Sequence, residues 1–254
     1  MARRSSLYGL FLLIVPACAT VQHEQSPVVP GLSLQVDRPA GPDTILYQRS
    51  VTRAGHDSMA GTRTVVLQLV RSPDHSDLLQ VVQRFPGGGG EIVDTAIAEL
   101  PTMRAVAHRS HQPTRIMRFT FGGSDAHGTV IALRPAGDSV TPVQQSLGGP
   151  IFDSNVIDLV VAALPLRPGF ATELPFFIYE RGGRVAMQVA VRERTTVTFT
   201  RLGPRDVWIV SVGVPGAPAT VWVDTRTHAV LRVRYDIAAR ALSFTDERVT
   251  RLHG

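Results

Sequence analysis

The sequence predicts a mainly β protein, built as a curved antiparallel sheet in a half-barrel or barrel-like form, with one short buried helix around residues 154–164. Apolar runs broken by glycine- and proline-rich turns recur along the chain from residue 43 onward. In the C-terminal half, the segment 185–191 alternates apolar and polar residues. This period of two is typical of antiparallel strands that cover a core with one face.

The expected strands follow one another with short breaks. In the first half they are 44–53, 63–71, 78–85, 92–100, 103–109, 115–121 and 129–134, and in the second half 174–179, 185–191, 197–199 and 231–235. The glycines at 87–90 and the segment 122–125 are typical hairpin turns. Many short strands at such spacing favour a barrel, a half-barrel or a sandwich.

One segment has helical spacing instead. Asp153 and Ser154 are suitable capping residues, and Pro165 ends a helix that reaches about Leu164. Its apolar residues at helical spacing are Phe152, Val156, Ile157, Val160, Val161 and Leu164. Asp158 is expected to face away from them. A helix this apolar should be buried on the concave side of the sheet.

The N-terminus has the order of an export signal. Two arginines precede the apolar run 7–15, which is followed by Ala17-Cys18-Ala19. Cys18, the single cysteine, stands where a bacterial lipobox would place a lipidated cysteine, so residues 1–18 are predicted to be a lipoprotein-type signal peptide. Ordinary cleavage after Ala19, giving a secreted protein, is the alternative. Residues 19–42 then form a flexible linker, and residues 43–254 a single β domain.

Composition excludes several classes of protein. A hydrophobic content of 44% excludes a disordered polymer. All 26 basic residues are arginine, and removal of Arg3 and Arg4 with the signal lowers the formal charge from +5 to +3. This charge is too small to indicate nucleic acid or another polyanion as a partner. One cysteine allows no disulfide within the chain.

The motifs at 152–159, 164–169, 189–193 and 220–224 resemble those of uncharacterised exported bacterial proteins with a domain of unknown function. That domain is in turn similar to the LolA/LolB lipoprotein carriers. The resemblance covers about residues 150–235. It implies a curved antiparallel sheet wrapped around helical segments, with an apolar cavity for acyl chains.

Other residue groups favour structural roles. Ser124, Asp125 and His127 lie within four positions but lack the spacing of a nucleophile elbow, so a hairpin turn is expected. His108 and His111 should face opposite sides of a strand, and the segment 74–77 adds no diagnostic ligand spacing. Gly87–Gly90 lacks the Lys-Ser/Thr of a phosphate loop. No catalytic residue, metal site or cofactor is therefore predicted.

Aromatic and arginine residues also come together in the C-terminal strands. Trp208, Trp222 and Tyr235 are expected in adjacent strands. The arginines nearby are Arg192, Arg194, Arg232 and Arg234. Such a platform can stack on bases or sugars, but arginine alternating with valine is also typical of a solvated sheet face, which is the favoured interpretation.

The sequence thus predicts a non-enzymatic protein of the periplasm or cell envelope, lipid-anchored through Cys18 to the outer membrane. It is expected to bind an apolar ligand or lipidated partner in a groove between sheet and helix. The predicted groove residues are Val156, Ile157, Val160, Val161, Leu164, Phe176, Phe177, Met187 and Trp222. A closed-core structural or interaction module of the envelope is the first alternative, and a secreted hydrolase is the second.

Overall fold

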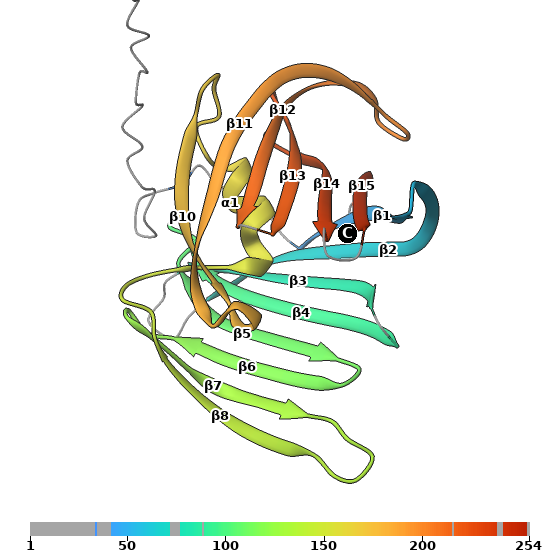
Figure 1. Cartoon of the computed structure of the whole chain (residues 1–254). Coiled ribbons are helices and arrows are strands. Elements are labelled where there is room, and N and C mark those ends of the chain that lie inside the picture. Colours follow the sequence, from blue (N-terminus) through green and yellow to red (C-terminus); the bar gives the residue numbers. More distant parts are fainter. Residues whose placement is uncertain are drawn as a thin grey trace, which may run out of the picture.

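The computed structural model describes residue 34 and residues 42–71, 77–87, 89–214, 216–237 and 241–252. These residues form one curved fifteen-stranded sheet made of two meanders (Figure 1). One meander runs outward from the middle of the sheet to one edge. The other begins at the opposite edge and runs back to the middle, where β15 pairs antiparallel with β1. The mainly β, curved-sheet prediction is confirmed.

The first meander contains eight strands, each paired antiparallel with the next. They are β1 (Asp43–Arg53), β2 (His56–Arg71), β3 (Asp77–Gly87), β4 (Gly90–Glu99), β5 (Ala105–Gln112), β6 (Arg115–Phe121), β7 (Asp125–Ala132) and β8 (Ser139–Ser146). Tight turns join many of them. Ala54 and Gly55, for example, take left-handed φ values of 49° and 80° between β1 and β2, a turn geometry that matches the twist of antiparallel strands.

A crossover returns the chain to the other edge and carries the helical elements. It consists of β9 (Phe152–Asp153), the 3₁₀ helix η1 (Ser154–Val156) and α1 (Ile157–Ala162). Asp153 caps η1 by accepting a hydrogen bond from the Asn155 backbone N–H at 2.8 Å, as its position predicts. The α1 helix lies in the hollow of the sheet (Figure 1).

The second meander leads from that edge back to the middle. Its elements are β10 (Ala171–Ile178), the 3₁₀ helix η2 (Tyr179–Arg181), β11 (Gly183–Phe199), β12 (Gly203–Val214), β13 (Ala217–Asp224), β14 (Val230–Ile237) and β15 (Leu242–Leu252). The β9–β10 pair is parallel over two residues. The other neighbouring pairs of described strands are antiparallel.

The main core fills the concave side between α1 and the sheet. It includes Val160 and Val161 from the helix, Phe176 from β10, and inward valines of β11–β13. A second cluster lies under β5–β7 around Phe119 and Phe177. A third, around Phe199, Val207 and Leu231, gathers residues that alternate with those of the main core along β12 and β13.

Several strand bounds differ from the predicted ones. The expected strand 103–109 is found at 105–112, because Met103 adopts a left-handed φ of 57° and its N–H bonds back to the Glu99 carbonyl. The strand expected at 129–134 is found at 125–132 as β7. The two strands expected at 185–191 and 197–199 are parts of one strand, β11. Neither β8 nor β15 was expected, since both carry mostly polar residues. Pro142 in β8 is tolerated because that strand lies at the sheet edge.

The predicted signal peptide, Cys18 and most of the predicted linker lie outside the described residues. Leu34, within that linker, is buried against the main core, and its N–H donates to the Pro101 carbonyl at 3.3 Å. Within the described part of the chain, no helix is both long and apolar enough to cross a membrane.

Candidate functional site

A band of charged and polar side chains crosses the concave face of the sheet. Four neighbouring strands, β15, β1, β2 and β3, each contribute one member, namely Asp246, Arg49, Arg63 and Gln83. All four side chains are buried. Arg49 and Asp246 are directly opposed in the β1–β15 register, which places their charged groups together.

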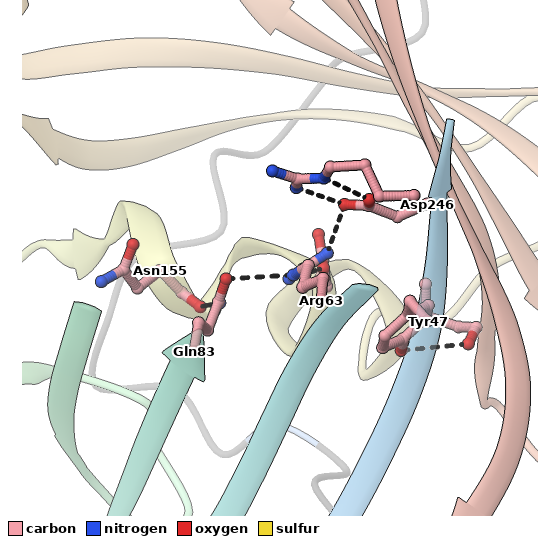
Figure 2. A network of polar contacts seen from close by, with 8 residues as sticks. Tyr47, Arg63, Gln83, Asn155 and Asp246 are labelled. Atoms are coloured by element: carbon pink, nitrogen blue, oxygen red, sulfur yellow. Dashed lines mark hydrogen bonds and ion pairs between the residues drawn. The ribbon is translucent and has the colours of Figure 1, made fainter. Parts of the chain in front are cut away.

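The band is held by hydrogen bonds, most of which are charge-assisted. Arg49 makes a bidentate contact in which Nε and Nη2 donate to the two Asp246 carboxylate oxygens at 2.7 Å each. Arg63 donates through Nη1 to Asp246 Oδ2 at 3.4 Å and through Nε to Gln83 Oε1 at 3.2 Å (Figure 2). Gln83 in turn donates to the Asn155 carbonyl of η1. Pairing of this kind is what permits charges to be buried.

Asp158 of α1 completes the network, which corrects the prediction that it faces away. Its Oδ2 accepts from Arg63 Nη2 at 2.7 Å, and the residue is 6% exposed. The helix is apolar nearly all round, so its one carboxylate would be expected to face solvent. Here the inward-facing arginine of β2 supplies a buried partner instead. The four charges, two arginines and two aspartates, balance.

Aromatic rings enclose the two arginines. The Arg49 guanidinium lies 4.5 Å from the Phe85 ring centroid and 5.8 Å from that of Phe244. Arg63 lies 5.3 Å from the ring of Tyr47. Burial raises the pKa of Tyr47 to about 12, and its hydroxyl donates to the Val230 carbonyl at 3.3 Å. The aromatic contacts and the ion pairs together hold both guanidinium groups in one orientation.

A cavity of about 580 Å³ opens beside this network, between the sheet and the start of the helical segment. Its lining combines polar groups with aromatic and aliphatic ones. The lining residues are Arg49, Arg63, Gln83, Phe85, Pro86, Gly87, Ile92, Asp94, Ser154, Asn155, Ile157, Tyr235 and Phe244. A smaller space of about 80 Å³ shares Arg63, Gln83 and Asn155 with it and reaches Asp158. A volume of this size can hold a small organic ligand.

Three buried polar atoms around these two spaces have no hydrogen-bond partner among the described residues. They are Oδ1 of Asp94, Nδ2 of Asn155 and Oδ1 of Asp158. A buried polar atom left unpaired costs about 1–3 kcal/mol. Burial also raises the pKa of Asp94 above its ordinary value, against the opposing effect of a hydrogen bond from Ser110. Unpaired polar groups are therefore concentrated at the cavity.

His108 and Asp153 form a second buried pair, which joins β5 to β9. His108 Nδ1 lies 2.9 Å from Asp153 Oδ2. Burial, the largest single effect, would by itself lower the pKa of His108, but the nearby carboxylates, Asp153 above all, together outweigh it, so the pKa lies above its ordinary value. Since Asp153 also caps η1, this pair fixes the start of the segment that borders the cavity.

The nine predicted groove residues do not form one surface. Val156, Val160, Val161, Leu164, Phe176 and Met187 are buried in the main core. Phe177 belongs to the second cluster, and Trp222 packs against the third. Ile157 is the one of the nine that lines the 580 Å³ cavity. The sequence did not predict the charged side of the site. Arg49, Arg63 and Asp246 stand in strands, and charged residues in strands are expected to face solvent rather than the interior.

Of the other residues considered in the sequence, those of the hairpin at 122–127 take the positions expected of them. Ser124 lies in the turn between β6 and β7, with Asp125 and His127 in contact on the exposed hairpin. His108 is buried and His111 exposed, as expected for residues three apart in a strand. The segment 72–76 lies outside the described residues. In the part that is described, no three His, Cys, Asp or Glu side chains are grouped to hold a metal ion.

Three of the four arginines of the C-terminal strands lie on a solvated face, as predicted, but the aromatic residues do not, because Trp208 and Tyr235 pack against the main core and Trp222 against the third cluster. Trp208, Trp222 and Tyr235 lie in the consecutive strands β12, β13 and β14. The exposed arginines are Arg192, Arg194 and Arg234. Arg232 is different, because it is half-buried, with its guanidinium 4.7 Å from the Phe199 ring and paired with Glu247.

Comparisons with known proteins identify relatives without an assigned activity. A family model described as "Protein of unknown function (DUF3108)" matches residues 50–243. A β-barrel-like DUF1849 protein from Brucella abortus is 13% identical, with a TM-score of 0.43 over 83% of this chain and 97% of that one.

Two further solved structures are similar at lower scores. A DUF1329 family protein from Desulfovibrio piger is 10% identical, with a TM-score of 0.32 over 84% and 85% of the two chains. A protein with a YmcC-like fold from Bacteroides fragilis is 9% identical, with a TM-score of 0.31 over 87% and 100%. A search of curated proteins gave no match.

Proposed function

The chain belongs to the DUF3108 family of proteins of unknown function, and we propose that it is an exported cell-envelope protein that binds an amphiphilic ligand without catalysing a reaction. The observation that carries this proposal is the 580 Å³ cavity between the sheet and the η1–α1 segment. A cavity with mostly apolar walls and a few converging polar groups is the usual form of a small-molecule site.

The lining favours a ligand with two chemically different ends. Phe85, Ile92 and Ile157 offer apolar contact, while Asp94 and Asn155 offer hydrogen bonds. This site differs in place from the groove expected from the sequence, but it keeps the same setting, between helix and sheet. The motifs within residues 150–235 resemble those of exported proteins whose domain is similar to the LolA/LolB carriers, and this resemblance supports a ligand with an acyl chain.

A binding role, rather than catalysis, agrees with the state of the charged groups at the cavity. Asp158 and Asp246 are engaged by arginines. Among the described residues, the cavity lining contains Ser154 but no histidine that could activate it as a nucleophile. The secreted-hydrolase alternative lacks support from these residues.

The envelope location rests on the sequence of the N-terminus. We propose that the N-terminal signal directs export and that Cys18 is diacylated as the first mature residue, which would hold the β domain at the outer membrane. Intact mass of the protein from a bacterial host, beside a Cys18→Ser variant, tests this step. A mature species that begins at Cys18 with a diacylglyceryl mass supports it, and a species that begins at Thr20 with no added mass contradicts it.

Ligand binding is tested by filling the cavity. The neutral fluorescent probe N-phenyl-1-naphthylamine should bind to the wild-type protein, and Ile92→Trp should weaken this binding at least fivefold, because the indole occupies the cavity. Val93→Trp is the matched control, since Val93 alternates with Ile92 along β4 and does not line the cavity. No binding to the wild type would favour the alternative, a closed structural module of the envelope.

A further inference from the structure

We propose that the ligand of this cavity carries hydroxyl groups at its polar end, as in a glycerol or sugar head group, and that Asp94, Asn155 and Asp158 recognise them. This inference rests on the proposed binding function and specifies the chemistry of its ligand. An anionic head group, such as a carboxylate, is the chemistry that the site disfavours.

The unpaired polar atoms belong to residues around two adjoining spaces. Asp94 Oδ1 and Asn155 Nδ2 belong to residues that line the larger cavity, and Asp158 Oδ1 belongs to a residue that lines the adjoining space. Asn155 borders both spaces. Asp158 is more than nine-tenths buried. One ligand that extends from the larger space into the smaller one could therefore reach all three atoms.

The chemistry of the three atoms indicates which ligand group can form hydrogen bonds with them. Two of the atoms are carboxylate oxygens, which accept hydrogen bonds, and the third is an amide nitrogen, which donates. A hydroxyl both donates and accepts, so a vicinal pair of hydroxyls can meet both needs. An ionised carboxylate only accepts and could serve Asn155 alone. An ammonium only donates and could serve the aspartates alone.

The charges at the site also favour an uncharged head group. Arg49 and Arg63 both line the cavity, but Nε and Nη2 of Arg49 and all three nitrogens of the Arg63 guanidinium already donate to Asp246, Asp158 or Gln83. An anionic ligand would have to compete with these buried carboxylates for the arginines and would lie beside Asp94. An uncharged polyol leaves the network intact. The positive charges of the band are thus balanced within the protein, and the unpaired buried atoms of the larger cavity's lining are those of Asp94 and Asn155.

A pair of probes with the same eight-carbon chain tests the inference on the full mature chain. The first is 1-octanoylglycerol, which has a hydroxylated head, and the second is octanoate, which has a carboxylate. Displacement of N-phenyl-1-naphthylamine gives the affinity of each. We expect 1-octanoylglycerol to bind at least tenfold more tightly than octanoate at pH 7.

Variants at Asp94 then locate the preference. Asp94→Ala should weaken 1-octanoylglycerol at least fivefold and leave octanoate unchanged or stronger. Asp94→Asn keeps an accepting oxygen and should stay within twofold of the wild type. Asp138→Ala, a change of the same residue type on an exposed loop, is the control.

The possible failures are distinguishable. Octanoate binding as tightly as 1-octanoylglycerol overturns the hydroxyl preference while the binding function stands. The same holds if the naphthylamine binds and neither octanoyl compound displaces it. If neither the naphthylamine nor an octanoyl compound binds to the wild-type protein, both the inference and the proposed function are wrong. The comparison of probes on the wild type decides the matter even if a variant fails to fold.

Discussion

Two parts of the same concave surface bury opposite chemistries. Towards β10–β13, the inward positions hold Phe176, Val210 and Val223, which belong to the same core cluster as the α1 valines and are fully buried. Towards β15–β3, the inward positions at one level hold Arg49, Arg63 and Asp246, which are buried almost as completely. Both parts follow strand alternation. Period two therefore fixes which way a side chain points, while its partners decide whether a charge can be buried there.

The two parts also differ in what they contribute to stability. The apolar part stabilises the fold in proportion to the area it removes from water, about 25 cal/mol per Å². The charged part loses hydration that its ion pairs recover only in part, so a buried network is weak evidence for stability. Its position beside the cavity suggests instead that it shapes and orients the site.

The largest effect is expected from breaking the charged part at its centre. Asp246 is fully buried and contacts both arginines. Asp246→Ala should lower the free energy of unfolding by about 3–5 kcal/mol, because Arg49 loses its buried counterion and Arg63 one of two. Urea unfolding measured by circular dichroism checks this.

Exposed Asp138 provides the control for that measurement. Asp138→Ala should change the free energy of unfolding by no more than about 0.5 kcal/mol. If Asp246→Ala proves as mild as this control, the charged part is not coupled to folding, and the contrast between the two parts fails.

The sequence predicted the apolar part well and the charged part poorly. Alternation along β11 and the capping Asp153 are local signals, and both are found as expected. The pairing of Arg63 with Asp158 joins residues 95 positions apart, and no local pattern indicates it. The polar strand β15 was missed for the same reason, because Asp246 becomes an interior residue only when Arg49 lies opposite.

The second prediction asks whether Leu164 belongs to a packed core or to a ligand groove. Leu164 is 1% exposed and lies within the main core cluster. Leu164→Ala should therefore cost about 2–5 kcal/mol of unfolding free energy, through lost burial and the cavity left behind. It should leave binding of N-phenyl-1-naphthylamine within twofold. A variant of unchanged stability with altered probe binding would mean that Leu164 lines a ligand groove, as the sequence predicted.

The third prediction converts part of the charged region into the apolar kind. The paired change Arg63→Met with Asp158→Leu replaces a buried ion pair by apolar side chains of similar size. Stability should stay the same or rise by about 1–4 kcal/mol, whereas Asp158→Leu alone should destabilise, since Arg63 then loses its shortest contact. Urea unfolding of the three proteins measures the coupling. A destabilised double variant would mean that the network itself holds the fold.

The smallest effect is expected from the pH dependence of the His108–Asp153 pair. His108 faces the carboxylates of Asp153, Asp94 and Glu180, and its pKa is raised above the ordinary value of 6.5. Because the folded protein then binds the proton more tightly than the unfolded chain does, this stabilisation is complete below pH 6.5 and is lost as the pH rises through the raised pKa. Urea unfolding of the wild type should thus show a fall in stability above pH 6.5, and His108→Gln should flatten it. An unchanged slope in His108→Gln would assign the fall to another group, and the pair would then fix the start of η1 without responding to pH.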